Sequence, residues 1–269
     1  MKSIVLNIFL LQNNTFSRLY LRQNLIVLDQ VTSTNDYLKQ LLSNITPSPQ
    51  GTAIMAIHQT QGKGQRGSQW ITQAGKNLTF SFALFPQNLP ATAAFNINMM
   101  VSLAIHKYLH KSVEQVKVKW PNDIYINNKK VGGVLIENQL SGRNIKSSVI
   151  GIGINVNQAN FSEDINHKAT SLARETGLPR ELQDTCLDIL ETFFDIYASV
   201  NVADTDLLLQ QYNELLYQKD MEAQYEIQGQ RKTGTIRRVT DNGLLLLEMD
   251  GEERSFDLKE ISFIPPTNL

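Results

Sequence analysis

The stretch Gly62-Lys63-Gly64-Gln65-Arg66-Gly67 matches the pattern G-x-G-x-x-G, in which glycines let the backbone come close to a phosphate. A dinucleotide-binding loop also needs a helix that opens directly after the glycines and an acidic residue about 20 positions further on. Residues 68–85 are instead typical of a loop and then a strand, and no Asp or Glu lies near Leu84. The sequence therefore argues against NAD binding, and the glycines need another explanation.

Three other segments carry side chains that could take part in chemistry. Residues 33–35 are Ser-Thr-Asn at the start of a predicted helix, and their short polar groups could bind an uncharged ring through hydrogen bonds. Residues 119–123, KWPND, form a strand-to-turn corner that precedes Lys130 in the segment KKVGGVLIE. Residues 151–157, GIGINVN, are predicted to form a strand with a polar end. A lysine in such a setting can stabilise developing negative charge, whereas no nucleophile or acid–base pair is evident.

In this order and spacing, the segments STN, QTQGKGQRGSQW, KWPNDIYINNKKVGGVLIE and GIGINVN resemble the catalytic domain of biotin protein ligases. The resemblance covers about residues 25–157 and continues more weakly toward the C-terminus. It implies an enzyme that activates biotin with ATP and Mg²⁺ to biotinyl-5'-AMP. It further implies transfer of biotin to a lysine of a biotin carboxyl carrier protein.

The same resemblance implies roles for individual residues. Lys130, Lys63 and Arg66 would be catalytic, with Lys130 beside the biotin carboxylate and the α-phosphate. The biotin-binding residues would be Ser33, Thr34, Asn35, Gln59, Gly62, Lys63, Gly64, Gln65, Lys130 and Gly133. The ATP-binding residues would be Trp70, Lys119, Asn122 and Asn155, and Asp123 would hold Mg²⁺ directly or through water.

The glycine-rich loop would then be a lid over the adenylate, and it departs from the commonest family pattern at two positions. Lys63 stands where arginine is usual, so it keeps the charge but loses the bidentate fork. Gln65 stands where a second arginine is frequent, which leaves Arg66 as the residue that could supply the missing charge.

Rival functions remain at this stage. A lipoate or octanoate protein ligase would share the fold but would need an apolar slot in place of the polar contacts. A biotin-sensing repressor would need a DNA-binding module, for which the 24 residues before the catalytic domain are too few. A non-catalytic adaptor would leave Lys130 and the glycine loop unexplained.

Composition and charge limit the possible partners and location of the protein. The 269 residues carry a net charge of −1, so no global basic field favours DNA. Cys186, the single cysteine, lies on the apolar side of a predicted helix, and no signal peptide or membrane span is predicted, so we expect a soluble, cytoplasmic protein without a membrane partner. The resemblance leaves a homodimer open.

The expected fold is α+β. Residues 1–24 would be an N-terminal extension, and residues 25–218 a catalytic domain with a mixed β-sheet and packed helices. Residues 219–269 would form a small SH3-like β-barrel, because short β runs alternate there with the turn signals Asp241-Asn242-Gly243 and Asp250-Gly251.

Overall fold

The protein is described by a computed structural model that covers residues 17–44, 49–200 and 205–264. A seven-stranded sheet forms its centre, in the order β1-β2-β5-β9-β8-β7-β6. The bounds of these strands are β1 Leu25–Val31, β2 Ala53–Gln59, β5 Leu78–Leu84, β6 Val116–Lys119, β7 Asp123–Ile126, β8 Lys129–Ser141 and β9 Asn144–Ile154. Only β1 and β2 pair in parallel, so the predicted mixed sheet is confirmed.

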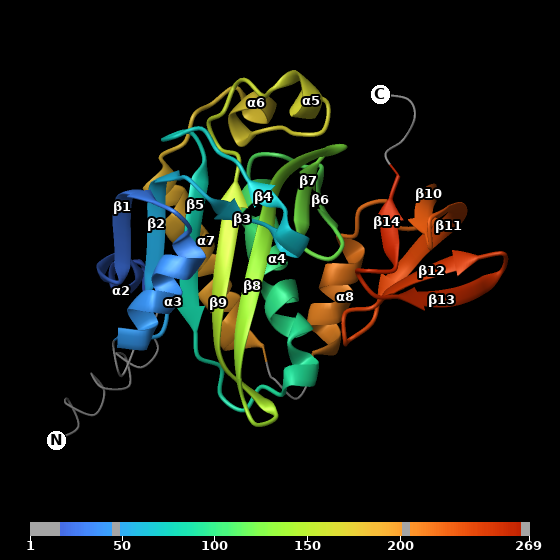
Figure 1. The fold of residues 1–269 in the computed structure, drawn as a ribbon, viewed down its shortest axis with the longest axis horizontal. Helices are drawn as coiled ribbons and strands as arrows, with labels where there is room; N and C mark the ends of the chain where they lie inside the picture. The colour runs from blue at the N-terminus through green and yellow to red at the C-terminus, as the bar shows by residue number, and fades with distance from the viewer. Residues whose placement is uncertain (1–16, 45–48, 201–204, 265–269) are drawn as a thin grey trace.

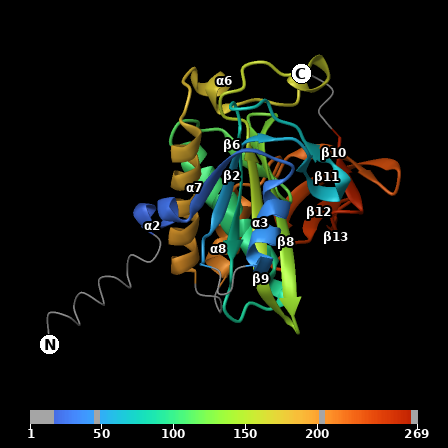
Figure 2. The same cartoon turned by 60° about the vertical axis from the view of Figure 1, so that its left-hand side comes forward.

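Helices cover both faces of this sheet. Helix α3 (Thr34–Asn44) lies on one face, against β2, β5 and β9. Helices α4 (Phe95–His110) and α7 (Leu182–Ser199) pack together on the opposite face, as Figures 1 and 2 show from two sides. Strand β5, LTFSFAL, is buried along its whole length because it lies between these layers.

The remaining helices lie around the sheet. Helix α8 (Asp206–Glu214) packs on α4, and the short helices α5 (Glu163–Asn166) and α6 (Leu172–Thr176) follow β9 at the upper edge in Figure 1. Helix α2 (Arg18–Gln23) packs on α7, where Leu21 is fully buried and Arg18 forms an ion pair with Asp184 at 2.9 Å. A single 3-10 turn, η2 (Ala91–Ala93), precedes α4.

The C-terminal part is a five-stranded antiparallel sheet in the order β13-β12-β11-β10-β14. Its strands are β10 Glu222–Ile227, β11 Gln230–Val239, β12 Leu245–Met249, β13 Glu252–Phe256 and β14 Ile261–Phe263. Within the described residues, the edge strands β13 and β14 do not pair with each other, so the sheet is open rather than a closed barrel. This arrangement is consistent with the SH3-like fold predicted from the sequence.

Both predicted hairpin turns of the C-terminal sheet are present. Asp250 and Gly251 have φ of 52° and 81° and join β12 to β13 in a two-residue turn, the geometry that Asp-Gly favours. Gly243, with φ of 88°, lies in the turn between β11 and β12. None of the helices in the described ranges is both long and apolar enough to cross a membrane.

Candidate active site

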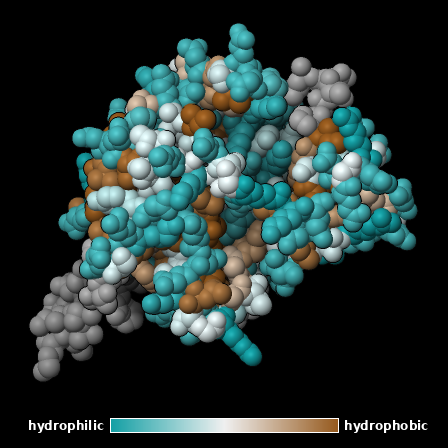
Figure 3. Space-filling model, in the orientation of Figure 1, coloured by the Kyte–Doolittle hydropathy of each residue, from teal (hydrophilic) through white to brown (hydrophobic). Residues whose placement is uncertain are grey.

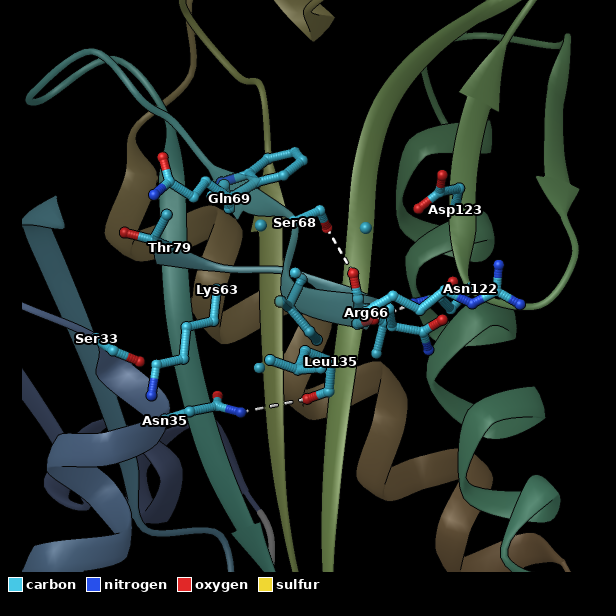
Figure 4. Close-up of a pocket in the computed structure, with 18 of the residues that line it drawn as sticks. Ser33, Asn35, Lys63, Arg66, Ser68, Gln69, Thr79, Asn122, Asp123 and Leu135 are labelled. Atoms are coloured by element: carbon cyan, nitrogen blue, oxygen red, sulfur yellow. Dashed lines mark hydrogen bonds between the residues drawn. The ribbon is translucent and has the colours of Figure 1, made fainter. Parts of the chain in front are cut away.

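A cavity of about 270 Å³ opens beside the carboxyl end of β2 and is lined by residues of α3, β2, β5, β7, β8 and β9 and of the glycine-rich loop. Figure 3 shows a hollow with hydrophilic surroundings between the large sheet and the C-terminal sheet. Leu258, which follows β13, also lines the cavity, so the C-terminal part contributes to its wall. Figure 4 shows how side chains from these elements converge.

The floor of the cavity is a buried polar cluster at the start of α3. Ser33, Thr34 and Asn35 are 2–4% exposed, and Ser33 Oγ accepts a hydrogen bond from the Asp36 N–H at 3.4 Å. This contact is the N-cap expected for Ser33. Gln59, at the end of β2, accepts a hydrogen bond from the Thr34 N–H at 2.9 Å through its Oε1. The predicted biotin-binding side chains are therefore brought together.

The glycine-rich loop lies over this floor as two two-residue strands, β3 (Gly62–Lys63) and β4 (Gln69–Trp70), joined by the 3-10 turn η1 (Gln65–Gly67). No helix follows it, so the structure excludes the dinucleotide interpretation. Arg66 adopts φ of 57°, a region unfavourable for a residue with a Cβ atom. A Cβ atom on Gly62 would lie 2.2 Å from the Trp70 carbonyl oxygen, so only glycine fits beside β4.

Lys63 of the loop reaches back to α3. Its Nζ lies 2.5 Å from Asp36 Oδ2, and in Figure 4 the side chain points toward the first turn of α3, between Ser33 and Asn35. The Asp36 carboxylate is also paired with Lys39 at 2.9 Å. The contacts with Lys63 and then Lys39 hold the pKa of Asp36 below its ordinary value. The loop is thus tied to the floor by an ion pair.

The corner at residues 119–123 is fixed from several directions. The carbonyl oxygen of Pro121 accepts hydrogen bonds from Asn98 of α4 at 2.6 Å and from Tyr212 of α8 at 2.8 Å. The indole N–H of Trp120 donates to the Gly243 carbonyl at 2.9 Å, and Asn122 is buried with its amide nitrogen bonded to the Val134 carbonyl. Trp120 is 5% exposed, so its ring packs in the core.

Lys130 and Asp123 form the charged side of the cavity. Lys130 Nζ lies 2.7 Å from Asp123 Oδ1 and 5.6 Å from the centre of the Trp70 ring. A Cβ atom on Gly133 would lie 3.2 Å from Asp123 Oδ1 and 3.4 Å from Lys130 Cε. The glycine three positions after Lys130 therefore leaves room for this ion pair.

Two further glycines shape the cavity and were not singled out from the sequence. A Cβ atom on Gly151 would lie 2.2 Å from Asn35 Oδ1, and one on Gly153 would lie 2.4 Å from the Trp70 ring. Gly151 thus lets the Asn35 side chain lie against β9, and Gly153 does the same for the Trp70 ring. The alternation GIGI in a strand is the signal that could have indicated this close approach.

Most of the predicted site residues line the cavity: Ser33, Thr34, Asn35, Gln59, Lys63, Gly64, Gln65, Arg66, Trp70, Asn122, Asp123, Lys130 and Gly133. Lys119, Asn155 and Gly62 are not among the lining residues. Lining residues that the sequence did not indicate include Ser68, Gln69, Thr79, Ile152, Leu258 and the two glycines of β9.

Two predicted ATP contacts have other partners in this structure. Lys119 Nζ lies 4.9 Å from the centre of the Phe263 ring and 3.3 Å from Tyr125 Oη, and burial lowers the pKa of this lysine. Asn155 is buried and donates to the Thr170 carbonyl at 3.1 Å. Their contacts with ATP stay predictions.

The cavity offers few ligands for a metal ion. Within the described ranges, no group of three or more His, Cys, Asp or Glu side chains could hold one. Asp123 is a single carboxylate and is paired with Lys130. This donor set fits a Mg²⁺ ion that takes most of its ligands from phosphates and water, which is the usual arrangement at nucleotide sites.

Comparison with known proteins shows what the chain resembles. The model of the biotin/lipoate A/B protein ligase family matches residues 27–155. The bifunctional ligase/repressor BirA of Bacillus spizizenii is 35% identical over 158 residues, which are 58% of this chain and 48% of that protein. The chain thus spans about half the length of this curated relative.

Relatives with narrower names point to one branch of the family. The biotin–[acetyl-CoA-carboxylase] ligase of Paracoccus denitrificans is 33% identical over 140 residues, 49% of this chain and 58% of that protein. The biotin protein ligase of Aquifex aeolicus, solved with biotin and ATP, superposes with a TM-score of 0.74 at 28% identity, covering 90% of this chain and 99% of that one. The resemblance predicted from the sequence is confirmed.

Proposed function

We propose that the chain is a biotin protein ligase that forms biotinyl-5'-AMP from biotin and ATP and then biotinylates a lysine of a biotin carboxyl carrier protein. The observation that carries this proposal is the placement of Lys130 and Asp123 across one cavity from the buried floor of Ser33, Thr34 and Gln59. An uncharged polar floor suits the ureido ring of biotin, while the cationic side suits the carboxylate and the α-phosphate.

The proposed reaction needs positioning and charge stabilisation rather than a protein nucleophile. The biotin carboxylate attacks the α-phosphorus of ATP and pyrophosphate leaves. Lys130, held by Asp123, lies where its ammonium can offset the charge that develops on the phosphate oxygens. The carrier lysine amine then attacks the anhydride carbonyl and AMP leaves.

The glycine-rich loop has a second task in this scheme. It covers the cavity with Arg66 and Gln65 among the lining residues, and the closed loop would keep water from the mixed anhydride. Trp70 would lie on the nucleotide side, where Lys130 is close to its ring. Mg²⁺ would arrive with ATP and use Asp123.

The partner and setting belong to the same proposal. A carrier domain would present its lysine at the open mouth of the cavity, and DNA is not a proposed partner. A homodimer is compatible with the proposal. We also propose a cytoplasmic location, where ATP and the carrier protein would be met and where the single, buried cysteine needs no disulfide partner.

The lipoate ligase alternative is disfavoured by the chemistry of the floor. Lipoate has no ureido group, so it would offer no polar partner to the Gln59 NH₂ group or to the lone pairs of the Thr34 hydroxyl, both of which belong to residues that line the cavity. The named relatives and the solved structures with biotin point the same way.

Mass spectrometry tests the proposal directly. The protein is incubated with a carrier domain, MgATP and either biotin or lipoate, and the carrier is weighed. We expect one biotin added to one lysine, dependent on ATP, and no addition of lipoate. A carrier that gains lipoate and not biotin, or that gains neither, would overturn the proposal.

A further inference from the structure

Ser81 of β5 lies directly beneath the floor of the cavity and does not itself line it. Its side chain is fully buried, and its Oγ lies 2.7 Å from Thr34 Oγ1 and 2.6 Å from Asn35 Oδ1. A hydroxyl has one proton, so Ser81 can donate only one of these two hydrogen bonds. The direction of both bonds can be worked out from the neighbouring groups.

Glu137 of β8 fixes the direction at one end. Its Oε2 lies 2.7 Å from Asn35 Nδ2, and its Oε1 is paired with Lys39 Nζ at 2.8 Å. A carboxylate beside a lysine accepts hydrogen bonds, so Asn35 must turn its NH₂ group toward Glu137 and its carbonyl oxygen toward Ser81. Because that oxygen only accepts, Ser81 donates its proton to Asn35.

The consequence reaches Thr34. With the Ser81 proton committed to Asn35, the 2.7 Å contact is a hydrogen bond only if Thr34 donates to Ser81. Gln59 Oε1, which accepts from the Thr34 N–H at 2.9 Å, also lies 3.2 Å from Thr34 Oγ1, and this longer contact is a weaker acceptor for the Thr34 proton than Ser81 at 2.7 Å. Two groups of this corner therefore remain for a ligand. The lone pairs of Thr34 Oγ1 can accept a hydrogen bond, and the NH₂ group of Gln59 can donate one.

We propose that Ser81 and Glu137 are positioning residues that set the donor–acceptor polarity of the head-group pocket. The ligand class that matches is a cyclic urea, whose ring N–H meets an acceptor at Thr34 and whose carbonyl meets donors. The assignment rests on the proposed function. It extends ligand recognition to two residues that do not touch the ligand, a buried serine of β5 and a carboxylate of β8, which β9 separates in the sheet.

A double-mutant cycle in biotin binding tests the relay. Ser81→Ala removes the nearer acceptor of the Thr34 proton, which can then turn toward the ligand N–H or toward Gln59 Oε1 at 3.2 Å, so biotin binding should weaken several-fold. In a Thr34→Val background, Ser81→Ala should have no further effect, because Ser81 acts through Thr34. Titration calorimetry measures each dissociation constant, and ATP affinity should not change in Ser81→Ala.

Ser148→Ala is the matched control. Ser148 is also a fully buried serine of the central sheet, and its Oγ lies 2.7 Å from an asparagine oxygen, that of Asn138, but it does not line the cavity. It should leave biotin affinity unchanged. Equal weakening by the two serine variants, or additive effects of Ser81→Ala and Thr34→Val, would overturn the relay and indicate a general loss of packing.

The far end of the relay is tested with two substitutions of similar size. Glu137→Met removes the acceptor for Asn35 and should weaken biotin binding several-fold. Glu137→Gln retains an oxygen that can accept, so it should lose less affinity than Glu137→Met. Equal losses in the two variants would contradict the relay, whereas a wild-type protein that does not bind biotin at all would contradict the proposed function instead.

Discussion

Lys130 is the single residue on which the proposed chemistry depends most. It lies among the cavity residues, paired with Asp123 at 2.7 Å and facing Trp70. Because a positioned cation in a closed site is worth on the order of 3 kcal/mol in the transition state, we expect Lys130→Ala to slow adenylate formation about 100-fold. Pyrophosphate release measures the rate.

The neighbouring lysine provides the control for this experiment. Lys129 begins β8 in the same hairpin but does not line the cavity, so Lys129→Ala should release pyrophosphate at the wild-type rate. If Lys130→Ala folds and turns over normally, Lys130 is a surface lysine and the assignment is wrong.

Gln65 is the second residue-scale test. It lines the cavity at a position where the sequence resemblance predicts arginine, and Arg66 beside it is strained at φ of 57°. A charge-assisted contact exceeds a neutral one by roughly 1 kcal/mol, so Gln65→Arg should slow adenylate loss about fivefold. Biotinylation of bystander lysines on an unrelated protein reports that loss. Unchanged labelling in Gln65→Arg and in Arg66→Ala would show that loop charge does not govern retention.

The sequence allowed us to predict residues that would contact a ligand, but not the residues that orient them. Lys130, Gln59 and Thr34 could be predicted because their motifs carry them. Ser81 and Glu137 could not, because their contacts join positions 46 and 102 residues away from Asn35. The packing of α3 on the central sheet, against β5 and β9, brings these groups together.

At the scale of elements, α3 and the glycine-rich loop act as one unit through the Lys63–Asp36 ion pair. An exposed pair of this kind is worth less than about 1 kcal/mol, so Asp36→Asn should raise trypsin cleavage at Lys63 and Arg66 only a few-fold. Biotin with ATP should protect the loop in both proteins.

Asp29→Asn is the control for this prediction, since Asp29 is an exposed carboxylate on β1. Its cleavage pattern should match that of the wild type. Cleavage that is unaffected by Asp36→Asn would show that the ion pair does not hold the loop, and cleavage unaffected by ligands would rule out a lid.

Helix α4 carries a half-buried histidine, His106, that affects stability in acid. Burial, and then the charges of His110, Lys117 and Lys107, lower the pKa of His106 from 6.5 to about 4. Between pH 6.5 and 4, the unfolded chain therefore binds a proton at His106 that the folded chain does not bind. The contribution of His106 to the free energy of unfolding should be fully present above pH 6.5. It should be lost as the pH falls from 6.5 to 4.

The contribution of His106 to this fall is at most about 1 to 2 kcal/mol, because the ring is partly exposed and screened. Urea denaturation at pH 7.5 and pH 4.5 measures it in wild type and in His106→Gln. We expect a smaller difference between the two pH values in the variant. The same difference in both proteins would assign the acid sensitivity to other groups.

Long elements were predictable from their periodicity and short ones were not. The predicted helix that carries Cys186 appears as Leu182–Ser199. Helices α5 and α6 are 4 and 5 residues long, too short to show an apolar repeat. Helix α2 lies within the predicted N-terminal extension, and its packing depends on contacts with α7 that no local pattern encodes.

For the whole molecule, the join between the two sheets depends on Gly243. This glycine accepts the Trp120 N–H, and a Cβ atom on it would lie 2.7 Å from the Phe95 ring. Gly243→Ala combines this clash with a positive φ of 88°, so we expect it to reduce the free energy of unfolding by roughly 2 to 4 kcal/mol.

Gly251→Ala separates the two causes. Gly251 has a similar φ of 81° with nothing near its hypothetical Cβ atom, so its substitution should cost only about 1 to 2 kcal/mol of backbone strain. Urea unfolding followed by circular dichroism measures both variants. Equal losses would mean that the contact between the sheets contributes nothing to stability.

The isolation of Cys186 has a practical consequence for watching this protein at work. It is the one cysteine in the chain, it is fully buried in α7, and burial raises the pKa of its thiol, so maleimide dyes should leave it unmodified in the folded state. A cysteine introduced at the exposed Gln73, just beyond the loop, would then carry the sole fluorophore. Its emission would follow loop closure in real time, in a single turnover, without any background from the native sequence.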